Sequence, residues 1–171
     1  FMRTIIHDLP EALAPTPKDS SEGFLSLRAN GRCAPCKGCF ACWLKRPGFC
    51  SIPDAFQHAG ALIGQSDPLL IVSRLLYGGY SAPIKAILDR SIGLSLPFFT
   101  WRGGQTHHLS RYPHRQLLRV CFYGGATQWE KETARELVER NRLNWDYERA
   151  EVFFYDEPAQ AKEACECALY S

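Results

Sequence analysis

The stretch that determines the fold is Pro68-Leu69-Leu70-Ile71-Val72-Ser73. It has four consecutive apolar side chains and no charged one. A continuous apolar run of this length is typical of a strand that is covered on both faces in a parallel sheet, so we expect it to be the central strand. Further strands are predicted at Arg3–His7, Gly23–Arg28, Leu117–Phe122 and Glu151–Tyr155.

Helix signals alternate with these strands. Thr127 and Glu130 match a capping box that opens a helix to about Arg140. Strands and helices that alternate at these lengths imply right-handed crossovers and a parallel sheet. We therefore expect an α/β fold in three layers, with helices on both faces of the sheet, in a single domain over residues 1–171. The residues expected to cap or begin the other helices are Asp8, Asp54, Ser81 and Pro158.

Composition limits the class of protein. The 171 residues are 46% hydrophobic and 22% charged, which suits one globular domain with a core. The sequence has no apolar run long enough to cross a bilayer and no signal-peptide pattern, so we expect a cytoplasmic protein that does not bind membranes. The net charge is +2. Because no nucleic-acid recognition motif is present either, nucleic acid is not an expected partner.

The segment from Arg90 to Trp129 contains no Asp or Glu, and we expect it to be electropositive. Within it, residues 92–116 are too long for an ordinary connection without secondary structure. We interpret them as an irregular stretch that is either a functional excursion or an interface arm. The basic and titratable residues of the segment are Arg90, Arg102, Arg111, Arg115, Arg119, His107, His108 and His114.

Five of the eight cysteines lie between Cys33 and Cys50. The spacing Cys36-x2-Cys39-x2-Cys42-x7-Cys50 offers four thiols that could hold an iron–sulfur cluster, since iron prefers thiolate ligands. The other interpretation is a packed structural loop, and zinc is disfavoured because structural zinc usually takes paired Cys-x-x-Cys knuckles. The cysteines expected to be buried or incidental thiols are Cys33, Cys121, Cys165 and Cys167.

Two segments resemble a known group. The first is Cys36-x-Gly38-Cys39-Phe-x-Cys42-Trp43-x-Lys45-x-Pro47-Gly48-x-Cys50, followed by Ile52-x-Asp54. It resembles the cysteine segment of the flavodoxin-like NADPH-dependent FMN reductase and iron–sulfur flavoprotein group. The second, Tyr77-Gly78-Gly79-Tyr80-Ser81-x-x-x-Lys85-x-x-Leu88-Asp89-Arg90, resembles that group's loop and helix after the central strand. The resemblance covers roughly residues 33–91 well and the rest by strand order only.

The resemblance implies a five-stranded parallel sheet in the order 2-1-3-4-5, with FMN at its carboxyl edge, commonly in homo-oligomers. It implies an FMN-dependent NAD(P)H oxidoreductase or electron-transfer flavoprotein, with a [4Fe–4S] cluster on Cys36, Cys39, Cys42 and Cys50 as an option. The partners would be a nicotinamide cofactor and a small electron acceptor. Because the flavin performs the chemistry, no catalytic residue is nominated. The residues implied at the flavin ring are Leu76, Tyr77, Gly78, Gly79, Tyr80, Tyr123, Gly124 and Gly125.

The turn after the first predicted strand departs from this group. Members that bind FMN usually have a glycine- and serine-rich turn there, whose N–H groups hold the phosphate. This chain has His7-Asp8-Leu9-Pro10-Glu11, in which the proline lacks a donor and the two carboxylates repel an anion. Two hypotheses follow: a bound anion is held by the arginines between Arg90 and Arg119, or the domain has lost FMN and serves as a binding or assembly module.

Overall fold

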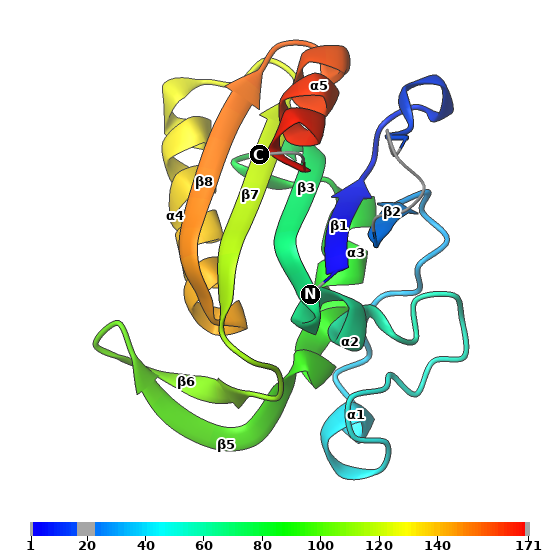
Figure 1. The fold of residues 1–171 in the computed structure, drawn as a ribbon, viewed down its shortest axis with the longest axis vertical. Helices are drawn as coiled ribbons and strands as arrows, with labels where there is room; N and C mark the ends of the chain where they lie inside the picture. Colours follow the sequence, from blue (N-terminus) through cyan, green and yellow to red (C-terminus); the bar gives the residue numbers. More distant parts are fainter. Residues whose placement is uncertain (1, 17–22, 170–171) are drawn as a thin grey trace.

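The computed structural model describes residues 2–16 and 23–169 of the chain. Its main sheet has the strand order β2-β1-β3-β7-β8, and all neighbours along this path are parallel (Figure 1). This is the predicted order 2-1-3-4-5, so the predicted fold class is confirmed. A short strand, β4, adds to β3 in the antiparallel direction. The bounds are Met2–His7 for β1, Phe24–Arg28 for β2, Ser66–Leu76 for β3, Gly79–Tyr80 for β4, Arg115–Tyr123 for β7 and Tyr147–Tyr155 for β8.

Helices cover both faces of this sheet, as predicted. The helix α5 packs on one face, and α3 and α4 pack on the other (Figure 1). The α-helices are Ala41–Leu44 for α1, Ala59–Gly64 for α2, Ala82–Asp89 for α3, Gln128–Trp145 for α4 and Pro158–Leu169 for α5. Two 3₁₀ helices, η1 at Glu11–Leu13 and η2 at Arg90–Leu94, complete the helical elements of the described residues.

The central strand β3 links the two hydrophobic cores. Leu69 and Ile71 belong to the core beneath α3 and α4, whereas Leu70 and Val72 belong to the core beneath α5. All four side chains are fully buried. Each contributes about 1.5–3 kcal/mol through burial, so the apolar run of β3 stabilises both layers at once.

Two expected helix caps differ from the structure. The N-cap of α2 is His58 rather than Asp54, and the N-cap of η1 is Pro10 rather than Asp8. Both aspartates instead bind groups that are distant in the sequence, as described below. By contrast, Thr127 and Glu130 form the predicted capping box, because each side chain binds the backbone N–H of the other.

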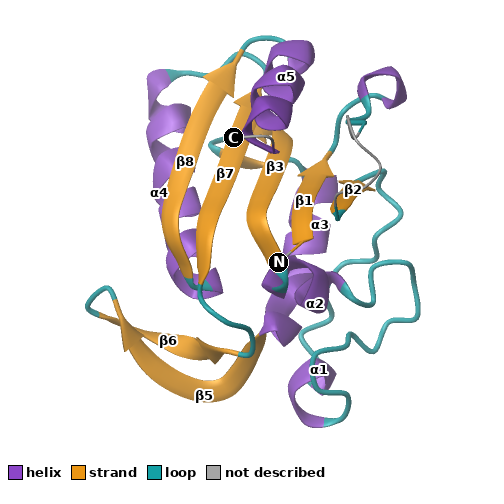
Figure 2. Cartoon of the chain, viewed as in Figure 1, coloured by secondary structure: helices purple, strands orange, loops and turns teal. Residues whose placement is uncertain are grey.

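Residues 92–116 are not an irregular stretch, and that expectation was wrong. After η2 they form an antiparallel hairpin of β5, Ser95–Arg102, and β6, Gln105–Ser110, which lies apart from the main sheet (Figure 2). Its turn is Gly103-Gly104, with φ of 55° and 75°. Two positive φ values suit a tight hairpin turn whose twist matches that of the strands.

Candidate functional site

The four predicted cluster ligands come together in space. Cys36, Cys39, Cys42 and Cys50 line one small cavity of about 20 Å³, which lies between the cysteine segment, residues 33–54, and the start of η2. None of these cysteines is in a disulfide. The four cysteines that the spacing singles out thus line one cavity, and their role as ligands of a cluster stays a prediction.

Left-handed backbone turns bring these cysteines to one cavity. Gly38 has a φ of 63° and Gly48 a φ of 86°, values that favour glycine. Phe40, which precedes α1, has a φ of 52°, which is uncommon for a residue with a side chain. A Cβ on Gly93 would lie 2.9 Å from the Gly48 carbonyl oxygen, so glycine at this position lets η2 pack closely on the cysteine segment.

The thiols differ in their local chemistry. A hydrogen bond with the Ser51 hydroxyl lowers the pKa of the Cys39 thiol, while burial raises the pKa of the Cys42 thiol. The Gly38 N–H donates to the Cys36 sulfur at 3.5 Å. Because metals bind the thiolate, the lowered pKa of the Cys39 thiol favours a role as a ligand.

The donor set fits an iron–sulfur cluster by its chemistry, since four cysteines line a common cavity next to N–H and hydroxyl donors. Their side chains are not arranged as metal ligands in this structure. Within residues 2–16 and 23–169, no three side chains of His, Cys, Asp or Glu are placed so that they could hold a metal ion. Binding of a cluster therefore requires the thiols to turn toward one another, and their assignment as ligands stays a prediction.

Arg90 holds the cysteine segment against the end of α3. Its side chain is fully buried, and its two terminal nitrogens donate to the two carboxylate oxygens of Asp54 at 2.7 and 2.8 Å. The same guanidinium donates to the carbonyl oxygens of Ala34 and Ile52 at 3.1 and 3.3 Å. The hydrogen bonds that Asp54 accepts from Arg90 and from the Phe56 and Ala34 N–H groups lower its pKa from 3.8 to about 2. Asp54 is therefore an anchor of this segment and not a helix cap.

The other cysteines are placed mostly as expected. Cys33 is buried beside Arg90, with Arg90 Nη1 3.8 Å from its sulfur, and burial raises the pKa of its thiol. Cys121 and Cys165 are buried in the core beneath α5. Cys167 is exposed, so it is not a core residue.

The two loops implied at a flavin ring lie side by side at the carboxyl edge of the sheet. They are neighbours because β3 pairs with β7, with Arg74 opposite Tyr123 at the ends of the two strands. A Cβ on Gly124 would lie 3.7 Å from the Arg74 side chain. Tyr77 is 94% exposed at this edge. Gly78, with a φ of 78°, lies against α4, where a Cβ would come within 2.7 Å of the Thr133 side chain.

The other residues implied at the flavin ring differ in how exposed their side chains are. Tyr80 is buried in the core, where its hydroxyl accepts a hydrogen bond from Asn141 at 3.0 Å and its ring lies 5.4 Å from that of Phe122. Tyr123 is half-buried, and burial together with Asp8 raises the pKa of its hydroxyl. The side chain best exposed for contact with a flat ligand is therefore Tyr77. The other predicted ring residues, Leu76, Gly79 and Gly125, lie in the same two loops or next to them.

The turn after β1 is filled by the protein's own groups. The Asp8 carboxylate accepts hydrogen bonds from the Arg74 N–H at 3.1 and 3.2 Å, and it also interacts with the Tyr123 hydroxyl. Glu11 pairs with Arg28 at 3.2 Å. The phosphate of FMN therefore does not fit this turn as the structure presents it.

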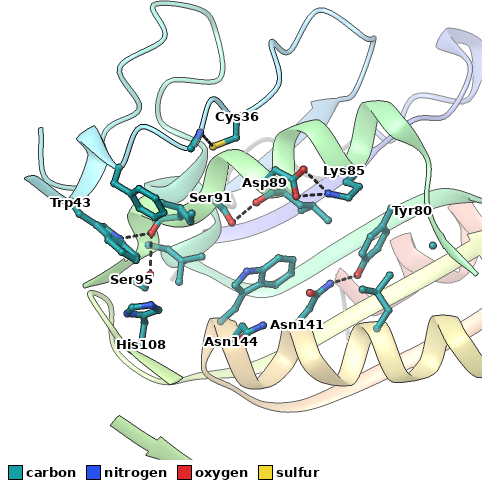
Figure 3. A pocket seen from close by; sticks show the side chains of 18 of the residues that line it. Cys36, Trp43, Tyr80, Lys85, Asp89, Ser91, Ser95, His108, Asn141 and Asn144 are labelled. Atoms are coloured by element: carbon teal, nitrogen blue, oxygen red, sulfur yellow. Dashed lines mark hydrogen bonds and ion pairs between the residues drawn. The ribbon is translucent and has the colours of Figure 1, made fainter. Parts of the chain in front are cut away.

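Sequence reasoning missed a cavity of about 840 Å³. It lies between α3 and α4 with the Cys36 side of the cysteine segment at its rim. Figure 3 shows Trp43 and His108 at one end of this groove and Tyr80 at the other. The His108 ring lies 4.7 Å from the Trp43 ring and 4.8 Å from the Phe99 ring. The lining comes from several elements, so no single motif could have revealed it.

The predicted arginine site for an anion is not supported, because each arginine has a protein partner. Arg115, which is fully buried, donates to the carbonyl oxygens of Gly64, Pro113 and Trp145. The other pairs are Arg90 with Asp54, Arg102 with Asp146, Arg119 with Glu151, and Arg111 with the Gly93 carbonyl oxygen. Three of these arginines thus pair with acids outside the acid-free tract, and the other two donate to backbone carbonyl oxygens. Separately, no helix in the described part of the chain is long and apolar enough to span a bilayer.

Comparisons with known proteins agree with the fold. No protein-family model matches the chain. An iron–sulfur flavoprotein of Methanosarcina thermophila is 33% identical over 64 residues, which is 37% of this chain and 32% of that protein. An iron–sulfur flavoprotein of Methanocaldococcus jannaschii is 35% identical over 75 residues, which is 44% of this chain and 37% of that protein. Each match thus spans only about a third of the relative's length.

A solved structure extends the comparison to the whole chain. An FMN-dependent NADH-azoreductase from Bacillus anthracis, in complex with FMN, superposes with a TM-score of 0.57 at 12% identity, covering 99% of this chain and 98% of that one. At this identity the likeness shows the fold alone. The chain therefore has the flavodoxin-like α/β fold and is similar, over part of its length, to iron–sulfur flavoproteins.

Proposed function

We propose that the protein is a flavin-dependent NAD(P)H oxidoreductase or electron-transfer flavoprotein that carries a [4Fe–4S] cluster on Cys36, Cys39, Cys42 and Cys50. The observation that carries this proposal is the common cavity of these four cysteines. The names of the two partial relatives, both iron–sulfur flavoproteins, support it. A cluster, when bound, accepts and releases electrons one at a time.

The chain's own residues prepare the cysteine segment for this role. The lowered pKa of Cys39 favours the thiolate, and the Gly38 N–H stabilises negative charge on the Cys36 sulfur. The Arg90 guanidinium, paired with Asp54, fixes the segment beside the cavity.

The groove between α3 and α4 supports the proposed partners. It extends from Cys36 to Leu76 and Tyr80, so it joins the cysteine segment to one of the loops implied at the flavin ring. Its volume of about 840 Å³ falls within the range of small-molecule sites, roughly 300–1,000 Å³. We infer that a small electron acceptor or a nicotinamide enters here.

A homo-oligomer is also part of the proposal. The β5–β6 hairpin exposes Phe98, Phe99 and Trp101, with 65%, 71% and 72% of their surfaces accessible to solvent. Neighbouring exposed aromatic side chains of this kind mark interaction surfaces. Sedimentation of the wild type beside a Phe99→Ser variant tests this inference, and a wild type that sediments as a monomer contradicts it.

The second candidate is a flavodoxin-like binding or assembly module that has lost FMN. The observation that favours it is the turn after β1, where Asp8 already accepts the Arg74 N–H. Adding flavin to the purified protein distinguishes the candidates, because only the first predicts a coloured complex and quenched flavin fluorescence.

The cluster is tested by purification without oxygen, followed by the visible spectrum and analysis of iron and acid-labile sulfide. We expect a brown protein, and we expect Cys42→Ser to lose most of its iron. Cys167→Ser is the matched control, since this exposed thiol lies on α5 away from the cavity. A colourless wild type that takes up no iron or sulfide on reconstitution rules out the cluster.

A further inference from the structure

The turn between β1 and η1 places a carboxylate where a bound phosphate would need its donors. The Arg74 N–H, at the carboxyl end of β3, points to Asp8 with N···O distances of 3.1 and 3.2 Å. Backbone N–H groups at strand and helix ends are the donors that commonly hold phosphates. The Asp8 carboxylate therefore already accepts the hydrogen bond of one of the backbone donors at this edge.

The rest of the turn offers little to replace that donor. Pro10 has no N–H, and the N–H of Asp8 itself donates to the Val72 carbonyl oxygen at 3.2 Å. The following helix, η1, spans only Glu11–Leu13. A helix of this length supplies no substantial dipole, so the usual attraction of an anion to a helix N-terminus is missing.

The nearby charges do not favour an anion either. Arg28 is shared between the Glu11 carboxylate and the Leu9 carbonyl oxygen, both at 3.2 Å. Burial lowers the pKa of His7 to about 4, so this side chain is neutral at pH 7. Arg28 and the exposed Arg74 thus balance Asp8 and Glu11, and the edge has no net positive charge to offer.

A carboxylate such as that of Asp8 binds a hydroxyl group more favourably than a phosphate. The half-buried Asp8 carboxylate accepts the Arg74 N–H and interacts with the Tyr123 hydroxyl, but a carboxylate has about four acceptor positions, so it can still accept a hydrogen bond from a ligand hydroxyl. In dinucleotide sites an acid near a strand end binds sugar hydroxyls, whereas an arginine is needed to accommodate a phosphate there. We propose that Asp8 makes the flavin site selective for a flavin whose side chain ends in a hydroxyl, riboflavin, over FMN. This inference rests on the proposed function, because it requires that the edge binds a flavin.

The test compares riboflavin with FMN by fluorescence quenching, in the wild type and in three variants. In the wild type we expect riboflavin to bind at least as tightly as FMN. Asp8→Asn keeps the shape and one acceptor oxygen for the Arg74 N–H but removes the charge, so it should tighten FMN binding about tenfold and leave riboflavin binding no tighter than in the wild type. Glu11→Gln should act in the same direction. Glu139→Gln is the control, since this carboxylate pairs with Arg142 in the second half of α4.

Salt supplies a second readout. Although the edge is neutral overall, the Asp8 carboxylate lies in the turn where the phosphate would bind, so added salt should screen its local repulsion and strengthen FMN binding to the wild type, with less effect on Asp8→Asn. A wild type that clearly prefers FMN, or an Asp8→Asn variant with unchanged FMN affinity, overturns the inference while the flavin function stands. A protein that binds neither flavin overturns both the flavin function and the inference.

Discussion

Replacing Arg90 should loosen the cysteine segment. Arg90→Met removes both hydrogen bonds to Asp54 and those to the carbonyl oxygens of Ala34 and Ile52. Removing one member of a buried ion pair typically costs about 3–5 kcal/mol. Asp54 retains the Phe56 and Ala34 N–H donors and is 22% exposed, so the lower end applies. We expect the free energy of unfolding to fall by about 3 kcal/mol.

Urea denaturation followed by tryptophan fluorescence measures this loss. The matched control is Lys85→Met on α3, the helix that ends just before Arg90. It removes a 2.6 Å ion pair between Lys85 and Asp89, whose side chains are 63% and 48% exposed. Exposed helix pairs contribute about 0.3–0.5 kcal/mol, so the control should be nearly neutral. Arg90→Lys, which keeps the charge but not the forked geometry, should fall between the two. The reasoning is refuted if Arg90→Met costs no more than Lys85→Met.

The same ion pair predicts a pH dependence. The pKa of Asp54 is lowered from 3.8 in the unfolded chain to about 2 in the folded protein. A lowered carboxyl pKa contributes stability above the unfolded pKa and loses it as the pH falls through the folded one. The difference in stability between wild type and Asp54→Asn should therefore be constant above about pH 5 and shrink between pH 4 and pH 2. A difference that is independent of pH over this range contradicts the assignment.

Three further changes test local features of the fold. Thr127→Ala removes the capping box of α4 and should cost about 1 kcal/mol in thermal unfolding. Gly78→Ala should cost more than about 1 kcal/mol in urea, because its φ is 78° and a Cβ would lie 2.7 Å from Thr133. Glu148 raises the pKa of His114, so this contribution to stability is present below pH 6.5 and lost as the pH rises through the folded pKa. An NMR titration of His114 in wild type and Glu148→Gln checks the shift.

The fold could be predicted because its determinants are local. The apolar run of β3 indicates burial on both faces of the sheet. The alternation of predicted strands with helix signals indicates crossover connections between parallel strands. The hairpin was missed although Gly103-Gly104 lies between two strand-forming stretches, a pattern that indicates a tight turn. The length of the segment alone predicts an excursion, whereas its two turn glycines predict the hairpin.

The candidate site could be predicted only in part. The spacing of the cysteines indicated one shared site because all four lie in the same short segment, residues 33–54, and there they line one cavity. The role of Asp54 was not visible, since its partner Arg90 is 36 residues away and a lone aspartate before a helix also matches a cap. Arg115 was misjudged for a similar reason. Its partners are carbonyl oxygens, which no composition reveals.

Two acids thus define the two halves of the candidate site. Asp54 fixes the cysteine segment through Arg90 at the end of α3, and Asp8 occupies the Arg74 N–H at the end of β3. The two contacts share no residue, so their effects on stability and binding should be close to additive. Asp8→Asn should change flavin selectivity without altering the iron content, and Arg90→Met should weaken iron retention without altering flavin selectivity. If either substitution changes both properties, the cysteine segment and the carboxyl edge form one coupled site.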